Sequence, residues 1–406
     1  MTFTGTAWFG RATFTGDAWF DEVTFTGDAR FDGATTGDAQ FGGATFTVLS
    51  SFGPLLCAGQ VDLSRCVFEA PVTMEIAAGE VNCFRTRWES TATLGLRYAT
   101  VDLSHAVWSS PAAVTTHPGP FTTVWTPVVE ESLLASRAPK VRVASVQGVE
   151  AAHLVLTDTD LSDCPFSGAF HLDQIRLEGF LFAPTPTGWH RRGIWPARWT
   201  RRRTLAEEHH WRARTARQSI PSAGEDPKPH LWRPGPHHTD AARTPDPEDV
   251  AALYRQLRKA FEDGKNEPGA ADFYYGECEM RRHDLTGTPK SERRLLWSYW
   301  LLSEYGLRAS RAFTWLLAAM SLTVLLLMGL GLPTHDPDPA LHGEWPKRMT
   351  WARAEKATRI AVNSVVFRSS GQNLTTAGTY IEMTSRLLEP TLLALGVLAI
   401  RGRIKR

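Results

Sequence analysis

The strongest constraint on the fold of this chain is a phenylalanine that returns every five or six residues near the N-terminus, with one longer gap. The positions with this spacing are Phe9, Phe14, Phe20, Phe25, Phe31, Phe41 and Phe46. Alanine stands two residues before each of them except Phe25, where Val23 takes that place. A period of about five matches neither an α-helix, with a side-chain period of about 3.6, nor a β-strand, with a period of about 2.

A five-residue period does match a square solenoid in which each side of the coil is one pentapeptide. One bulky and one small side chain per side then point inward and stack on their equivalents in the next coil, about 4.8 Å away. Such a coil buries its core only against its neighbours, so several coils are needed for stability. We therefore predict that the seven phenylalanines form the core of a solenoid.

The pattern resembles the pentapeptide-repeat family, whose consensus is A(D/N)Lxx with Leu or Phe at the centre. The resemblance implies a mainly β fold, a right-handed quadrilateral β-helix, over residues 1–183. The repeat is regular over 1–47 and degenerate over 48–183, where Asp-Leu-Ser tripeptides at 62, 102 and 160 keep the unit. We expect a break between Pro111 and Pro127. Because Thr2 to Phe9 is already repeat sequence, the structural start is expected upstream.

Composition limits the chemistry of the chain. The net charge of +1 provides no global field that would attract nucleic acid. The five cysteines form no CxxC pair, which indicates reduced, buried thiols instead of a disulfide framework. The sequence contains no phosphate loop, metal-ligand cluster or nucleophile elbow, and a fold alone supplies no chemistry. We therefore expect no enzyme, no catalytic residue, no cofactor and no metal.

Residues 184–245 form a linker rich in Pro, Arg, His and Trp. Its basic and aromatic side chains are Arg191, Arg192, Trp195, Arg198, Trp199, Arg201, Arg202 and Arg203. They are candidates for contacts with an anionic lipid surface, where Trp lies at the headgroup level. A plain solvated linker is the equal alternative, and single-stranded nucleic acid is less favoured. The adjacent His209 and His210 would diverge on a helix and chelate a metal poorly.

Residues 246–300 predict a helical hairpin that serves as a neck. Asp246 and Pro247 are typical of a helix start, and Gly264 of its end. Val250, Leu253, Tyr254, Leu257 and Phe261 form one apolar stripe, and Pro268 opens a second helix. The segment resembles the neck of actinobacterial pentapeptide-repeat membrane proteins. Its acidic side chains are expected on a solvated, ion-paired surface.

Residues 301–406 predict a membrane module with two spans. Residues 312–332 carry no charge and are long enough to cross the hydrocarbon core. The second span is expected at about 383–400, although it contains Glu389 and Pro390, and four basic residues end the chain. Two spans would leave both termini in the cytoplasm. Basic residues in the loop between the spans weaken that argument.

An amphipathic helix is expected at 351–367, followed by a polar loop. The order of span, short helix, loop and span resembles the two-helix pore module of potassium-type channels. The filter position would be occupied by Thr375, Thr376, Ala377, Gly378 and Thr379. Those filters need more glycines than the one present here, so the resemblance implies a degenerate pore loop.

Two functions follow from this organisation. The first is a non-enzymatic membrane-anchored scaffold, which presents the repeat surface to an unidentified protein partner on the cytoplasmic face. The alternative is a channel-like homo-oligomer with the solenoid as a cytoplasmic sensor. Both place the chain in the cell membrane, in contact with membrane lipids, and neither involves nucleic acid.

Overall fold

The structure is a computed structural model that describes residues 1–122, 134, 136–187, 189–192, 195–220, 228–237, 240, 243–332, 350–366 and 374–404. It divides into two compact units, Met1–Gly287 and Thr288–Arg406. The first unit contains the solenoid and the elements that cover its last coil. The second unit is helical.

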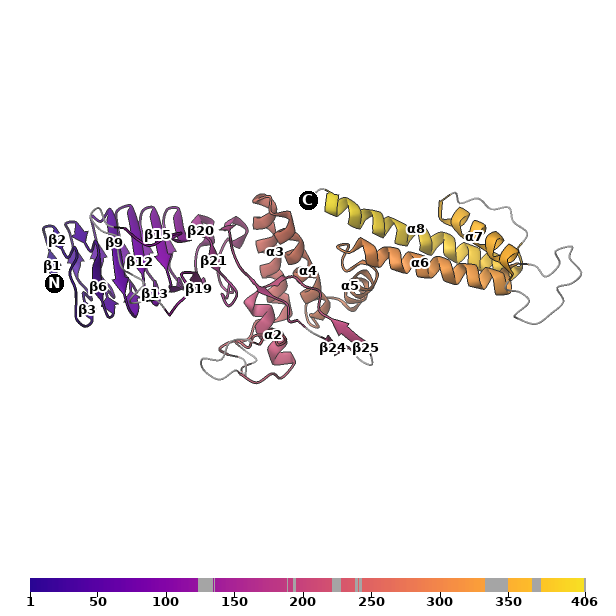
Figure 1. Cartoon of the computed structure of the whole chain (residues 1–406), viewed down its shortest axis with the longest axis horizontal. Helices are drawn as coiled ribbons and strands as arrows, with labels where there is room; N and C mark the ends of the chain where they lie inside the picture. Colours follow the sequence, from indigo (N-terminus) through magenta and orange to yellow (C-terminus); the bar gives the residue numbers. More distant parts are fainter. Residues whose placement is uncertain are drawn as a thin grey trace, which may run out of the picture. The chain divides into compact units, whose positions relative to one another are not determined.

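The first unit begins with a parallel β-solenoid, in which strands from successive coils lie side by side (Figure 1). The strands of face 1 are β1 (Thr2–Phe3), β4 (Thr24–Phe25), β8 (Thr45–Phe46), β11 (Val67–Phe68), β14 (Arg87–Trp88) and β17 (Val107–Trp108). The strands of face 2 are β3 (Ala18–Trp19), β7 (Ala39–Gln40), β10 (Gln60–Asp62), β13 (Glu80–Asn82), β16 (Thr100–Asp102), β19 (Val141–Ser145) and β21 (Thr159–Asp160).

Face 3 carries the longest strands. They are β6 (Ala34–Thr36), β9 (Ser51–Cys57), β12 (Val72–Ala77), β15 (Ala92–Arg97), β18 (Ala112–Thr116), β20 (Leu154–Thr157) and β22 (Arg176–Glu178). A fourth side is marked by β2 (Ala7–Trp8) and β5 (Ala29–Arg30), which pair in parallel. The predicted mainly β solenoid is therefore confirmed.

Aromatic rings stack along face 1 because equivalent residues of successive coils are in register. Phe3, Phe25, Phe46, Phe68, Trp88 and Trp108 form one continuous column. Neighbouring rings in it are 5.2, 5.0, 4.9, 4.3 and 5.0 Å apart between centroids. The bulky inward residue of one coil thus packs directly on that of the next, as the period of five predicts.

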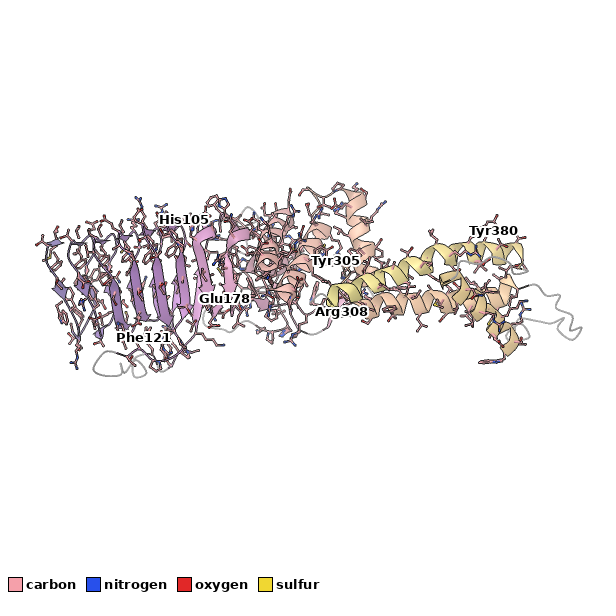
Figure 2. The ribbon with its side chains drawn as sticks, turned by 90° about the horizontal axis from the view of Figure 1, so that it is seen from above. His105, Phe121, Glu178, Tyr305, Arg308 and Tyr380 are labelled. Atoms are coloured by element: carbon pink, nitrogen blue, oxygen red, sulfur yellow. The ribbon has the colours of Figure 1, made fainter. Side chains whose placement is uncertain are left out.

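One corner of the coil requires a left-handed backbone. Glu22, Gly43, Arg65, Arg85 and His105 occupy it in successive coils, all with φ between 56° and 70°. His105 lies at the edge of the solenoid in Figure 2. Glycine adopts this conformation at no steric cost, whereas the other four residues adopt it under the constraint of the stacked coils.

The stretch after residue 47 is more regular than expected. Glu80 pairs with Gln60 and with Thr100, so these coils advance by 20 residues each. The predicted break also begins later than Pro111, because Ala112–Thr116 pairs in register with β15. The next coil places Arg142 beside Thr100. Between them, Phe121 packs against Ala77 and Tyr98 on the side of the solenoid (Figure 2).

Helices cover the last coil of the solenoid. The single turns η1 (Ala151–His153) and η2 (Leu172–Gln174) belong to the final coils. Beyond them come α2 (Ala206–Thr215) and the expected helical pair, α3 (Pro247–Asp263) and α4 (Glu267–His283). Phe180 contacts Phe261 and Phe182 contacts Phe273, so these helices share the solenoid core. Two short antiparallel ladders join β23 (Ala183–Pro184) to β26 (Arg203–Thr204) and β24 (Trp189–Arg192) to β25 (Trp195–Arg198).

The second unit is built from α5 (Lys290–Ser303), α6 (Ala309–Leu326), the π-helix η3 (Leu327–Gly331), α7 (Trp351–Val366) and α8 (Thr376–Ile404). Tyr305 and Arg308 belong to the turn between α5 and α6 (Figure 2). Helix α7 occupies the segment expected to be amphipathic and packs on η3 through Ala357 and Ile360. Two stretches, Ala309–Gly331 and Thr376–Ile400, are long and apolar enough to cross a membrane. The second begins earlier than the expected position near 383.

Candidate functional site

The structure places the seven predicted core phenylalanines inside the solenoid. Phe25, Phe31, Phe41 and Phe46 are fully buried. Phe9, Phe14 and Phe20 belong to the first coil and are half-buried. The gap in the spacing falls at Thr36, which takes the inward position of a phenylalanine. Its hydroxyl donates a hydrogen bond to the carbonyl of Asp38 over 2.8 Å.

The Asp-Leu-Ser tripeptides form a ladder of turns beside face 2. The side-chain oxygens of Asp62, Asn82, Asp102 and Asp160 each accept a hydrogen bond from the backbone N–H two residues later, at 2.9 to 3.0 Å. These side chains therefore stabilise the backbone at one corner of the coil, as short polar residues commonly do.

Large side chains project from the outward surface of the first coil. Trp8 and Trp19 are 66% and 71% exposed.

A buried carboxyl group closes the last coil. Glu207, in the first turn of α2, accepts hydrogen bonds through Oε1 from the N–H groups of Phe166 and Ser167 and from the Ser167 hydroxyl. Burial raises the pKa of Glu207. Helix α2 thus binds the backbone N–H groups of the last coil, which a further coil of the solenoid would otherwise have bonded.

A buried ionic network joins α2 to the neck helices. Glu208 Oε1 lies 2.6 Å from Arg202 Nη2 and 2.7 Å from Arg212 Nε, and the Tyr254 hydroxyl donates to Oε2 over 2.6 Å. Arg212 also contacts Glu279 at 3.2 Å. Burial alone would raise the pKa of Glu208, but Arg202 and Arg212 outweigh it and hold that pKa at about 2. Burial lowers the pKa of the neighbouring His209 to about 3.

Buried ion pairs correct two expectations about surfaces. Glu277 and Glu279 were expected on the solvated face of the neck, yet both are buried. Arg202 was expected to contact lipid, yet it is 5% exposed and bound to Glu208. The physical reason is shared: each buried charge has an opposite partner on another element, which compensates for its lost hydration.

The other basic and aromatic candidates are divided between two places. Arg191, Arg192, Trp195 and Arg198 lie on the β24–β25 ladder, and the orientation of their side chains is outside the described residues. Trp199 packs against Trp232, with the Arg212 guanidinium 4.8 Å from its ring. Arg203 lies over the ring of Phe180, and Arg201 is exposed. The lipid-surface hypothesis is therefore wrong for the buried Arg202 and stays a prediction for the other side chains.

The apolar helix pair of the second unit has an inverted distribution of polarity. Leu317 and Leu322 of α6 are 68% and 57% exposed, and Leu387 of α8 is 77% exposed. By contrast, Thr323 and Glu389 are buried between the helices, where the Thr323 hydroxyl donates to Glu389 Oε1 over 2.7 Å. In water, the outer face of a helix pair is normally polar. Here the outer face is apolar and the polar groups point inward.

The predicted pore-loop residues form a helix start. Thr376, Ala377, Gly378 and Thr379 lie in the first turn of α8, and the hydroxyl of Thr375 accepts a hydrogen bond from the N–H of Gly378. A Cβ atom at Gly378 would lie 2.5 Å from the carbonyl oxygen of Gly331. Glycine at 378 therefore permits close packing of α8 on η3.

A comparison with known protein families finds a match for the first coils of the solenoid. The family model described as pentapeptide repeats (9 copies) matches residues 1–45. These coils are pentapeptide repeats. No curated protein and no solved structure matches the chain.

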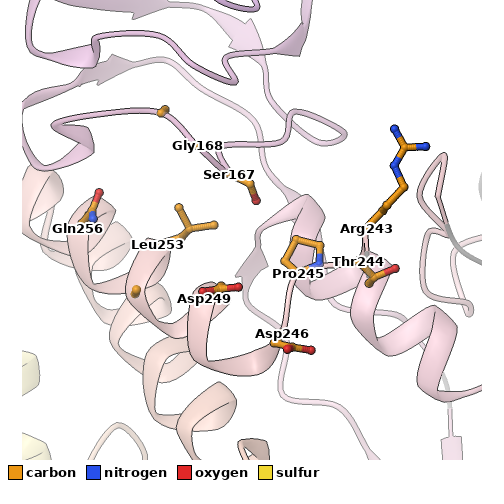
Figure 3. Close-up of a pocket in the computed structure, with 11 residues that line it drawn as sticks. Ser167, Gly168, Arg243, Thr244, Pro245, Asp246, Asp249, Leu253 and Gln256 are labelled. Atoms are coloured by element: carbon orange, nitrogen blue, oxygen red, sulfur yellow. The ribbon is translucent and has the colours of Figure 1, made fainter. Parts of the chain in front are cut away.

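The pentapeptide solenoid is a structural repeat fold. Its cysteines are buried, and burial raises the pKa of Cys57 to about 12, which leaves a poorly nucleophilic thiol. Within the described residues, no three His, Cys, Asp or Glu side chains converge as metal ligands. A cavity of about 580 Å³ lies between the last coil and α3 (Figure 3). Its lining mixes Arg243, Asp246 and Asp249 with neutral side chains, which defines no ligand class.

Two sets of residues were missed in the sequence. Glu207 and Glu208, which join α2 to the last coil and to the neck helices, gave no local signal, because their partners Ser167 and Arg202 belong to other elements. Thr323 was missed because nothing in the sequence pairs it with Glu389. A usable signal existed in α8, where Ser385, Glu389, Leu392 and Ala399 are separated by four, three and seven residues, which places them on one helix face.

Proposed function

We propose that the chain is a non-enzymatic, membrane-anchored scaffold whose pentapeptide solenoid presents a surface to a protein partner. A solenoid exposes a long surface for its mass, which suits binding of an extended partner. The exposed Trp8 and Trp19 give that surface aromatic contact area. Helices α6 and α8 are the proposed anchor, in contact with membrane lipids.

The observation that carries the anchor is the inverted polarity of the helix pair. Exposed leucines on α6 and α8 suit hydrocarbon, and inward polar side chains avoid it. Arg308 and Arg311 lie at the start of the first span, and Arg401 and Arg403 follow the second. By the positive-inside rule, these ends favour the cytoplasmic side, together with the solenoid.

The helical conformation of Thr376–Thr379 gives the channel alternative no support, because a carbonyl-lined filter needs extended backbone. A homo-oligomer stays compatible with the scaffold, since lipid-facing leucines can also pack against a second copy.

Membrane fractionation tests the anchor. The full chain should stay in the pellet after alkaline carbonate extraction, and a chain ended after Gly287 should be released. A chain ended after Arg386 should still pellet through the first span. If the form ended after Gly287 remains with lipid after a high-salt wash, the anchor lies elsewhere in the chain.

A further inference from the structure

A carboxyl group is buried in the middle of the helix pair. Glu389 has no exposed surface and stands near the centre of the apolar stretch Thr376–Ile400. Its partner Thr323 belongs to the facing helix, and the hydrogen bond between Oγ1 and Oε1 is 2.7 Å long. Both residues lie on the inward stripes of their helices, which consist of Ala312, Leu316, Thr323 and Leu327 on one side and Ser385, Glu389, Leu392 and Ala399 on the other.

Glu389 has no compensating charge within the described part of the chain. Its second oxygen, Oε2, is buried and has no hydrogen-bond partner there. The basic side chain nearest in sequence, Arg386, is paired with Glu382 over 2.6 Å. A bare carboxylate at the centre of a membrane helix is unfavourable, because hydrocarbon cannot hydrate its charge.

The contacts fit a neutral carboxylic acid. In that form Oε1 is the carbonyl oxygen, which accepts the hydrogen bond of Thr323, and Oε2 carries the proton. A neutral acid needs no counter-ion, so this form is compatible with the lack of an ion pair to Glu389 in the described part of the chain.

We propose that Glu389 is a proton-binding site inside the helix pair, with Thr323 as its positioning residue. The proposal rests on the membrane anchor proposed above. One proton binds per chain, it bonds to one carboxyl oxygen, and no other bond changes. Loss of that proton places a negative charge between α6 and α8, so proton binding is coupled to the packing of the two helices.

A hydrophobic carbodiimide tests the site, because it reacts with protonated carboxyl groups in apolar surroundings. The full chain in phospholipid vesicles, shown to resist carbonate extraction, is treated with dicyclohexylcarbodiimide. The acid O–H adds across a C=N bond to give an O-acylisourea, which rearranges to a stable N-acylurea with no atom lost. We expect this adduct on the peptide that contains Glu389 and its loss in Glu389→Gln. The matched variant Glu382→Gln should keep it.

Infrared spectroscopy tests the role of Thr323. The wild-type protein should show a carboxylic-acid C=O band that disappears in Glu389→Gln. Thr323→Val should shift this band to higher frequency, since its hydrogen bond is lost, and Thr323→Ser should restore it. A carbonate-resistant protein with no adduct or acid band at Glu389 would overturn the proton site and leave the anchor intact. A protein that carbonate extracts would overturn the anchor and the site together.

Discussion

At the residue scale, Glu207 and Glu208 are neighbours in the sequence with opposite electrostatic surroundings. Glu207 accepts hydrogen bonds from uncharged groups only, and burial raises its pKa. Glu208 lies between two guanidinium groups, which hold its pKa at about 2. The two side chains therefore give a matched pair for testing what holds α2 on the last coil and on the neck helices.

We expect Glu208→Gln to destabilise the first unit by about 3–5 kcal/mol at neutral pH, because it leaves Arg202 buried without a counter-charge. Glu207→Gln should cost less than about 1 kcal/mol, since the amide oxygen can still accept from Ser167. Denaturant unfolding of the two variants measures the difference. Equal losses of unfolding free energy in the two variants would show that the ionic network of Glu208 contributes nothing specific to the packing of α2.

The pH dependence of stability follows from the same groups. The folded pKa of Glu208 is below its ordinary value of 4.5, so its contribution is complete above pH 4.5 and is lost as the pH falls toward 2. The shift corresponds to about 3 kcal/mol. His209 acts in the same direction, from pH 6.5 down to about 3, because it is buried uncharged. The raised pKa of Glu207 acts in the opposite direction, so the histidine is isolated by comparison: between pH 7 and pH 4 the unfolding free energy of the wild type should lose more than that of His209→Gln.

The solenoid core gives a second residue-scale prediction. Phe25 is fully buried and stacks on Phe3 and Phe46, whereas the next residue, Thr26, is exposed. Phe25→Ala should cost about 3–5 kcal/mol. Phe25→Asp should disrupt the first coils, and Thr26→Asp should be tolerated. Thermal melts followed by circular dichroism compare the variants, and identical melts for the two aspartates would contradict the register.

At the element scale, the coil of 20 residues is the unit of the central solenoid. Gln60, Glu80 and Thr100 are partners in one ladder, and so are Val67, Arg87 and Val107. Because each coil contacts only its neighbours, removal of a whole coil leaves two complementary surfaces that can pack on each other.

Deletion of residues 60–79 should therefore leave a folded solenoid with one coil fewer and a single cooperative melt. Trp88 would then stack on Phe46 in place of Phe68. Deletion of residues 60–78 is the control, because a slip of one residue exchanges inward and outward side chains. The prediction fails if the two deletion proteins have the same melting behaviour.

The sequence predicted secondary-structure elements better than the side-chain contacts between them. The period of five located the phenylalanine core, and the stripe from Val250 to Phe261 located α3, since both depend on local spacing. The segment around Arg202 was expected to be a linker, because its buried contacts with Glu208 and Tyr254 involve other elements. Glu389 was visible as an acid within an apolar run, but the rotation of α6 that brings Thr323 to it depends on packing between helices.

At the scale of the whole molecule, the two compact units have different outer surfaces. The unit Met1–Gly287 has one continuous core from the coils to α3 and α4. We expect a chain ended after Gly287 to be soluble and to unfold in one transition. Its circular-dichroism signal from the β-solenoid should equal that of the full-length chain. Aggregation of that chain, or melting of the solenoid separately from the neck, would contradict a shared core.

The column of rings on face 1 has an optical consequence. The indole rings of Trp88 and Trp108 are held 5.0 Å apart and within 11° of parallel. At that separation their electronic transitions couple, so the ultraviolet spectrum of the pair differs from that of two isolated indoles. The coupling depends on two residues in successive coils, whereas the backbone circular-dichroism signal averages over the whole chain. The solenoid thus contains its own chromophore pair, which reports whether the coil of Trp108 is still packed on the coil of Trp88.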